Sequence, residues 1–381
     1  MPPGPWLLVV GMHRSGTSAV TGALGHLGFA VPAPDDRWEP SDQNPDHFES
    51  RALANYDDVL LEKLGGTWDR PPEPDLDWES ADLGDPSGPA SEAFPSPGPV
   101  VWKDPRSCLL LPYWLGQLPK PVAAVFIWRS PIAVARSLQS RDRLPLADGV
   151  ALWERYNRSG LAGLIGVDTF VTRYESIVED PAGKLGALAS WLGELPQFAT
   201  HAPHWDLAAA AASISPQLRR QQASGEADLL LDEHRRLTAR LEDLEGPHRP
   251  LHSALTGSAS PWAAALLADR HQLAVLSGQR DTYRETARLR QWEIQGLVAQ
   301  VGGLNDHVNG LKDHVEQLKD HVEQLQDYVE LLKDELERSR TELAELHEAY
   351  EAMQTSTSWR VTRPLRQVAT LKSRNVTTPG D

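Results

Sequence analysis

A seven-residue repeat, "LKDHVEQ LKDHVEQ LQDYVEL", lies in the last third of this 381-residue chain and leaves that part few ways to fold. Apolar residues recur there in strict 4-3 spacing, which places them on one stripe of an α-helix. Valine at a positions with leucine at d positions favours two parallel helices. The repeat therefore predicts a coiled coil over residues 291–354 and a homodimer formed through it; the alternative is a lone amphipathic surface helix. The a and d residues of this series are Val308, Leu311, Val315, Leu318, Val322, Leu325, Val329, Leu332, Leu336, Leu343, Leu346, Tyr350 and Met353.

Near the other end, the stretch "LLVVGMHRSGTS" reads as a strand that runs into a glycine-rich loop. Gly11 and Gly16 have the spacing of a phosphate-binding loop and Ser18 keeps its hydroxyl, but Thr17 stands where that loop has its lysine. The run "SAVTGALGHLG" predicts a helix whose first N–H groups and positive dipole end favour an anion. Arg14 can supply the missing charge as a planar fork. We therefore expect an anion loop; the alternative is a glycine turn made only for packing.

Behind this loop, short apolar runs alternate with helix-like segments. The runs "WLLVV", "VVWK", "VAAVFIW" and "DTFVTRY" predict strands of a parallel sheet covered by helices on both faces. The fold class predicted is thus α/β, a P-loop-like parallel sheet covered by helices, followed by a long α-helical coiled coil. Lys103, Arg129 and Tyr174 lie at predicted strand ends, which meet at one edge of such a sheet and so predict a single site.

Composition completes the domain plan. We expect a first domain at 1–245 with a flexible Pro-rich insertion at 69–99, a helical linker region at 246–290, the coiled coil and a basic tail at 355–381.

The net charge of -16 argues against nucleic-acid binding. No apolar run has the length of a membrane span, "WLLVV" is too short for a signal peptide, and the single Cys108 excludes an internal disulfide, so a cytoplasmic protein is expected. The basic tail is interpreted as a disordered end, a hint of a glycan-related enzyme, or a weak membrane-surface contact.

Three further motifs, "VWKDPR", "IWRSPIAVARSLQSR" and "TRYESIVEDP", follow the loop in order. Together they resemble the sulfotransferase family, in particular its tyrosylprotein, heparan N-sulfotransferase and bacterial branches, over residues 6–245. The resemblance implies 3′-phosphoadenosine 5′-phosphosulfate (PAPS) as co-substrate and no metal. It also implies roles for individual residues. In that family the loop holds the 5′-phosphosulfate, a role that would fall to Arg14, Ser15, Gly16, Thr17 and Ser18. The 3′-phosphate would be bound by Arg129 and Ser137, with Arg141 as an added contact. Lys103 would steady the bridging oxygen of the departing phosphosulfate, and Tyr174 would lie along the nucleotide.

The acceptor needs a general base. The stretch "NPDHFES" resembles the "NPxGxxE" segment of bacterial sulfotransferases, which makes Glu49 the first candidate. Asp46 and His47 stand where that segment has glycine, so the match is incomplete, and His47 and His13 remain alternatives. Glu49 as a mere helix cap is the other interpretation. The predicted catalytic set is Glu49, Lys103, Arg14 and His47.

The function predicted from the resemblance is transfer of the sulfuryl group of PAPS to a hydroxyl or amine acceptor, a bacterial glycan or glycolipid precursor. The alternative is a non-catalytic scaffold of the same fold that dimerises and recruits glycan-assembly partners. A P-loop kinase is disfavoured by Thr17 and by the lack of a clear Mg-binding aspartate at a strand end.

Overall fold

A five-stranded sheet forms the centre of the first part of the chain in a computed structural model, which describes residues 4–38, 47–73, 78, 83–96, 98–214, 230–252 and 259–364. The strand order is β2-β1-β3-β4-β5, with the first four strands parallel and β5 antiparallel to β4. The strands are β1 (Trp6–Val10), β2 (Val100–Lys103), β3 (Val122–Trp128), β4 (Asp168–Arg173) and β5 (Gly246–His248).

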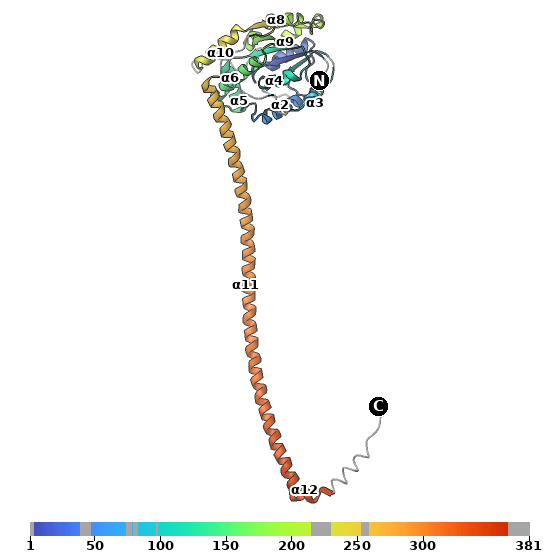
Figure 1. Cartoon of the computed structure of the whole chain (residues 1–381), viewed down its shortest axis with the longest axis vertical. Helices are drawn as coiled ribbons and strands as arrows, with labels where there is room; N and C mark the ends of the chain where they lie inside the picture. The colour runs from blue at the N-terminus through green and yellow to red at the C-terminus, as the bar shows by residue number, and fades with distance from the viewer. Residues whose placement is uncertain are drawn as a thin grey trace, which may run out of the picture. The chain divides into compact units, whose positions relative to one another are not determined.

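Helices cover both faces of this sheet, as the strand pattern predicts (Figure 1). They are α1 (Thr17–His26), α2 (Arg51–Lys63), α3 (Ser87–Ala93), α4 (Ser107–Gln117), α5 (Pro131–Asp142), α6 (Leu146–Gly163), α7 (Tyr174–Glu179), α8 (Pro181–Gly193), α9 (Leu207–Ser213) and α10 (Asp232–Asp243), with single 3₁₀ turns at Pro34–Asp36 and Ala202–His204.

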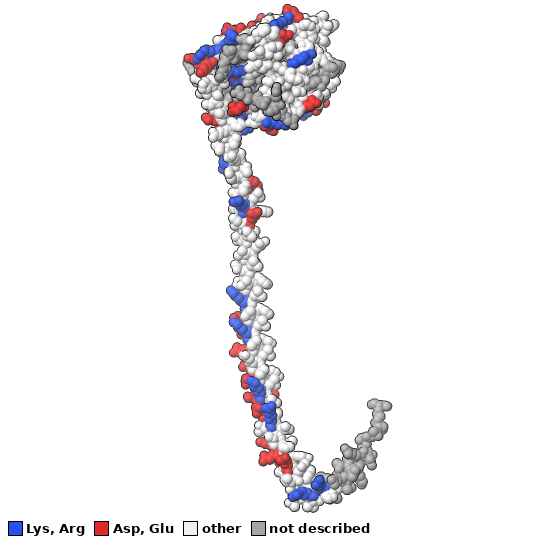
Figure 2. Space-filling view, viewed as in Figure 1, with Lys and Arg blue, Asp and Glu red and all other residues white. Residues whose placement is uncertain are grey.

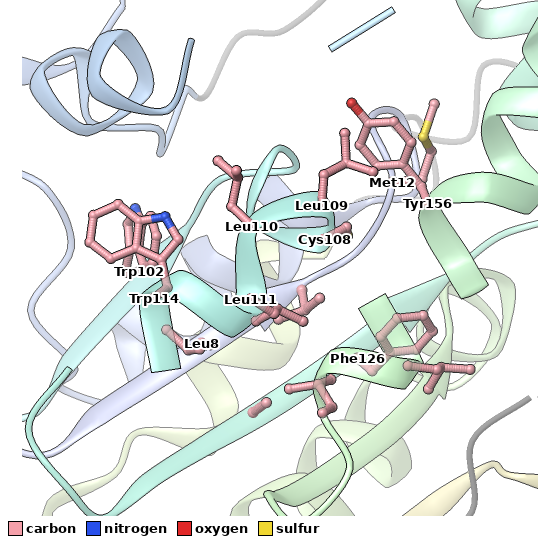
Figure 3. Packing of buried hydrophobic residues seen from close by; sticks show 14 of the residues in the cluster. Leu8, Met12, Trp102, Cys108, Leu109, Leu110, Leu111, Trp114, Phe126 and Tyr156 are labelled. Carbon is pink, nitrogen blue, oxygen red and sulfur yellow. The ribbon is translucent and has the colours of Figure 1, made fainter. Parts of the chain in front are cut away.

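Alternation along the strands divides the core in two. In β1, Leu8 and Val10 point to one face and Leu7 and Val9 to the other, because successive strand side chains alternate. The first face packs against side chains of α2, α4, α5, α6 and α10, and the second against α1, α7, α8 and α9. Figure 3 shows part of the first layer, where leucines of α4 lie beside Leu8 and Phe126.

The strand order fixes where a ligand can bind. The chain leaves β1 for β2 on one side and returns to β3 on the other, so the connections diverge at the carboxyl ends of β1 and β3. In open α/β sheets this divergence leaves a crevice in which ligands bind. The loop after β1 contains Gly11–Gly16 and the residue after β3 is Arg129, so the predicted anion residues lie at this point.

Two parts of the domain differ from the sequence prediction. The strand β5 extends the sheet beyond residue 245, and the compact unit runs on to Arg280, because Leu251 and Ala263 are buried against it. The insertion 69–99 is not a flexible surface segment throughout: its described part includes α3, with Ala90, Ala93 and Phe94 buried in the core. Residues 74–77, 79–82 and 97 of the insertion lie outside the described residues.

The C-terminal part is helical. Helix α11 runs from Pro261 to Thr355 without a break, beginning well before the predicted coiled coil, and a short α12 (Thr357–Val361) follows. Figure 2 shows the charged side chains of the lower part of α11 mostly along one edge of the helix. Within the basic tail, residues 365–381 lie outside the described part of the chain. None of the helices in the described ranges is both long and apolar enough to cross a membrane.

Candidate active site

The loop after β1 is forced into close contact with its neighbours by two glycines. A Cβ on Gly11 would lie 2.3 Å from the carbonyl oxygen of Ile127 in β3, and a Cβ on Gly16 would lie 2.0 Å from the Tyr174 ring. Gly16 has φ +90° and Arg14 has φ +68°, both in the left-handed region. The loop therefore turns sharply between β3 and Tyr174, and glycine is needed at both contacts.

The loop then opens helix α1, which begins at Thr17, with Gly16 at the N-cap and no side chain capping it. Thr17 is buried, and its carbonyl oxygen accepts a hydrogen bond from the Thr21 hydroxyl. The Ser15 side chain is fully buried, and its hydroxyl has no hydrogen-bond partner among the described residues. A buried polar group without a partner is costly, so this hydroxyl is suited to a ligand.

Three predicted nucleotide contacts meet beside the loop. The Arg14 Nε donates to the Ser137 hydroxyl at 2.8 Å, although 123 residues separate them. Arg129 donates from Nη1 to the Arg14 carbonyl oxygen at 3.1 Å, and its guanidinium lies 5.1 Å from the centre of the Tyr174 ring. Arg14, Arg129, Ser137 and Tyr174 thus form one group built by the loop after β1, the residue after β3, α5 and the start of α7.

Two residues that the sequence did not single out hold Arg129 in place. The Trp153 indole donates to the Arg129 carbonyl oxygen at 2.8 Å. One Glu175 carboxylate oxygen lies 4.0 Å from Arg129 Nε and accepts from the Ser130 backbone N–H, while the other accepts from Arg173. The position of Glu175 next to Tyr174 was the available sequence signal; Trp153 gave none.

Positive charge concentrates at this point. Burial, followed by the guanidinium groups of Arg141 and Arg129, lowers the pKa of Arg14 to about 10. Cations that weaken one another's protonation in this way gain from an anion placed between them. Arg129 is only 6% exposed, so this charge is largely shielded from water.

Lys103, the last residue of β2, forms a second group. Its ammonium donates to the Ser18 hydroxyl at 2.8 Å and is hydrogen-bonded and ion-paired to Glu49. The other Glu49 oxygen lies 3.3 Å from His47 Nδ1. Ser18, Glu49 and His47 therefore come together around Lys103, which is only 1% exposed.

The state of Glu49 follows from these contacts. Burial acts to raise the pKa of Glu49, but the charge of Lys103 and the hydrogen bonds from His47 and Lys103 outweigh burial and hold the pKa below its usual range. Glu49 is not the helix cap: α2 begins at Arg51, and the Ser50 hydroxyl accepts from the Leu53 backbone N–H at 3.1 Å. The capping interpretation is therefore excluded by the position of Ser50.

His13 lies in the loop itself and is 8% exposed. Its ring centre is 4.8 Å from that of Trp68 and 5.8 Å from that of Tyr156. Burial, followed by the charges of Arg106 and Arg141, lowers the pKa of His13 well below 6.5. Its Nε2 atom has no hydrogen-bond partner in the described part of the chain. His13 is therefore a neutral imidazole with an open nitrogen, and Trp68 is a neighbour that sequence reasoning missed.

Arg141 has contacts other than the predicted ones, and Arg106 and Cys108 lie outside the group of site residues. The Arg141 guanidinium donates to Asp142 at 2.8 and 2.9 Å and lies 5.6 Å from the Trp68 ring centre; among the described residues it makes no hydrogen bond to Ser137. Arg106 is paired with Asp58 and Asp104 and is structural. Cys108 is a core residue in the first turn of α4, where burial raises the pKa of its thiol (Figure 3). No three His, Cys, Asp or Glu side chains gather as metal ligands within the described ranges.

No protein-family model matches the chain, and no curated protein matches it. Among solved structures, the chain is similar to a sulfotransferase domain from the curacin biosynthetic pathway, with 17% identity, a TM-score of 0.37 and coverage of 64% of this chain and 98% of that one. It is also similar to a sulfotransferase domain from the olefin synthase of Synechococcus PCC 7002, with 15% identity, a TM-score of 0.29 and coverage of 70% and 94%. At this level of similarity, a function has to be argued from the residues of the chain itself.

Proposed function

We propose that this protein is a PAPS-dependent sulfotransferase that moves a sulfuryl group to a hydroxyl or amine acceptor. The observation that carries the proposal is the convergence of Arg14, Arg129 and Ser137 with Lys103 and Ser18 at the divergence of β1 and β3. These residues come from three separate parts of the sequence, around residues 14–18, 103 and 129–137. A packing motif would not bring the guanidinium groups of Arg14 and Arg129 together at one glycine-rich turn, because like charges repel unless an anion compensates them.

The residues present fit a donor with two separated anionic groups. One anion position is offered by Arg129 and Ser137, next to the flat face of the buried Tyr174 ring. A second is offered by the Ser15 hydroxyl, the start of α1 and the Lys103 ammonium. PAPS, when bound, supplies the activated sulfuryl group and a phosphate leaving group. Arg14 belongs to the same loop and adds charge between the two positions.

In this proposal Lys103 stabilises the leaving group, and Glu49 accepts the proton of the acceptor. In the structure Lys103 is engaged by Glu49, which neutralises both groups. An anion at the loop competes with Glu49 for the Lys103 ammonium. A hydrogen bond that Lys103 gives to the leaving phosphate, in place of Glu49, stabilises the charge that grows on that phosphate in the transition state. Loss of the Lys103 contact raises the pKa of Glu49, because that charge is what keeps it low. Glu49 then becomes a better acceptor for the proton of the acceptor hydroxyl.

Two histidines are the alternative bases. His47 Nδ1 lies 3.3 Å from Glu49 and can take up the acceptor's proton through that carboxylate. His13 is neutral and has an open Nε2, the form that a base requires. Glu49 remains first because it directly couples to Lys103, which links proton removal to the presence of the donor.

For the acceptor, we propose a bacterial glycan or glycolipid precursor, supported only by the resemblance of the tail "STSWRVTRPLRQV" to segments behind coiled coils in surface-glycan enzymes. For the location we propose the cytoplasm, and for the basic tail a weak contact with a membrane surface. The assay that decides the acceptor is transfer of label from PAPS to glycans of the source organism.

A second proposal concerns α11, whose apolar row suits a parallel homodimer. Its Val and Leu side chains at a and d positions are 44% exposed at Leu332 and 71% at Leu346, with the others between. A helix that leaves this many apolar side chains in water gains by pairing with a copy of itself. A non-catalytic scaffold with the same helix is the alternative, and it would not retain a paired Lys103 and Glu49.

Thermal unfolding with nucleotides tests the proposed function. PAPS, or its desulfated product, should raise the melting temperature, because a ligand that binds only the folded state stabilises it. ATP with Mg²⁺ at equal concentration is the control and should leave the melting temperature unchanged. Stabilisation by ATP but not by the desulfated nucleotide would replace the proposal with a kinase-like site, and binding without sulfate transfer would favour the scaffold.

A further inference from the structure

Helix α11 reaches the side of the candidate site through one arginine. Arg270 lies in the part of α11 that belongs to the first compact unit. Its Nη2 donates to the Asp69 carboxylate at 2.5 Å and its Nε to the Asp69 carbonyl oxygen at 2.9 Å. Its Nη1 donates to the Asp148 carboxylate, in the first turn of α6, at 2.7 Å. Three charge-assisted or backbone bonds from one side chain make a rigid attachment.

The residues that Arg270 holds form a tight turn. Thr67 and Arg70 exchange backbone hydrogen bonds at 2.8 and 3.2 Å, so Trp68 and Asp69 occupy the two central positions. The Thr67 hydroxyl also donates to the Asp69 carboxylate at 2.7 Å. Because Asp69 is fixed on both of its oxygens, the Trp68 backbone next to it is fixed as well.

Trp68 in turn covers the loop of the candidate site. Its carbonyl oxygen accepts from the Tyr156 hydroxyl at 2.6 Å, and its ring packs 4.8 Å from His13. The Arg141 guanidinium lies over the same ring. Trp68 therefore separates His13 from water and lies between the loop after β1 and the end of α5.

We propose that Arg270 is a positioning residue: by holding the 67–70 turn, it keeps Trp68 against His13 and so fixes the wall of the site beside the transferring group. Its consequence for catalysis rests on the proposed function, but its structural part does not. Loss of Arg270 should let the turn move and admit water to His13. The attachment through Asp69 carries the effect, whereas the one through Asp148 only braces the arginine.

The test reads His13 directly by NMR titration of its ring proton in the full chain, with His13→Gln used to assign the signal. The groups that act on the pKa of His13 besides burial are Arg106, Arg141 and Lys103, which lower it, and Glu49, which raises it. Within the described part of the chain, Arg270 bonds to Asp69 and Asp148 and to none of these four groups. In Arg270→Gln and Asp69→Ala the pKa of His13 should therefore rise toward 6.5, because burial is the largest cause of its depression.

Matched variants separate positioning from general loss of stability. Asp148→Ala removes the other partner of Arg270, and Arg284→Gln removes an exposed arginine of α11 that is paired with Asp281 three residues before it. Both should leave the pKa of His13 at its wild-type value. An unchanged pKa in Arg270→Gln, or an equal rise in Asp148→Ala, would overturn the proposal.

Kinetics then tests the catalytic part. Arg270→Gln should lower sulfate transfer about tenfold, the scale of a small misplacement of a site wall, while the Kd of the desulfated nucleotide stays within about twofold of wild type. In a Trp68→Ala background the same substitution should have no further effect, because both changes act through one contact. Additive losses would show that Arg270 acts elsewhere. If no sulfate transfer occurs at all, the proposed function fails, whereas the NMR result still decides the role of Arg270.

Discussion

The Arg129 side chain is nearly buried, donates to the loop after β1 and lies against the Tyr174 ring, so its guanidinium is held in one orientation. Arg129→Ala should weaken binding of PAPS, because one charge-assisted bond to a phosphate is worth about 1.5–3 kcal/mol, or roughly ten- to over a hundredfold in affinity. Calorimetry with the desulfated nucleotide measures this change. Arg284→Ala, on exposed α11, is the control. Equal affinities of Arg129→Ala and wild type would refute the assignment of the 3′-phosphate.

A second prediction concerns the role of Glu49 as general base. Glu49→Gln should lower turnover by about 10² to 10⁴, the usual contribution of a general base. Nucleotide affinity should not fall, because the substitution releases Lys103 from its ion pair. Steady-state rates and calorimetry on the same samples separate the two effects, with exposed Glu62→Gln in α2 as control. Near-normal turnover would transfer the role of base to His47 or His13.

Sequence reasoning identified Arg129 because it follows a strand that can be read from a short apolar run, and Glu49 because "NPDHFES" resembles a segment of bacterial sulfotransferases. It could not find Trp68, which contacts His13 across 55 positions of sequence and lies in a segment that reads as loop. Nor could it tell Arg106, which is saturated by Asp58 and Asp104, from Arg129. Such pairings depend on how helices pack, and no local pattern encodes them.

Among the elements, α6 joins the start of α11 to the domain through Glu154. This fully buried carboxylate accepts from the Ser260 N–H at 2.8 Å, the Ser260 hydroxyl at 2.6 Å and Arg158 at 2.8 Å, and His234 of α10 lies 3.3 Å away. Burial acts to raise its pKa, but the bonds from His234, Ser260 and Arg158 lower it to about 2.

Glu154→Gln should therefore destabilise the fold by about 3 kcal/mol at neutral pH, the scale of breaking a buried charge pair. Because the folded pKa is depressed, this contribution is fully present above the ordinary value of 4.5 and is lost as pH falls toward 2. Urea unfolding of wild type and variant across this range measures the difference. A gap that stays constant from pH 6 to pH 2.5 would show that the charge of Glu154 is not the cause.

Elements were predictable where the pattern was regular, as in the short apolar runs of the four parallel strands and the heptads of α11. The three-residue β5 was not, because "GPH" has no strand periodicity and pairs only through the backbone of β4. Helix α3 was missed for a similar reason: seven residues rich in Ser, Gly and Ala resemble a loop until Ala90 and Ala93 reach the core.

For the whole molecule, we expect a parallel dimer at neutral pH. Light scattering should give a dimer for the full chain and a monomer for a chain that ends near residue 285, just beyond the compact unit that closes at Arg280. In the full chain, Val315→Lys with Val322→Lys places charges at two adjacent a positions and should also give a monomer. Exposed Glu316→Lys with Glu323→Lys is the matched control, because these residues lie outside the apolar row. A full-length monomer at micromolar concentration would rule out the coiled-coil pairing.

The ion pair between Lys103 and Glu49 also sets an order of events for a sulfotransferase built this way. An acceptor that arrives first meets a carboxylate already engaged by the ammonium, so its hydroxyl finds no ready proton acceptor. The donor must enter first and draw Lys103 away before the acceptor can be activated. Such an enzyme would follow an ordered sequential scheme, with the desulfated nucleotide leaving last and competing only with PAPS.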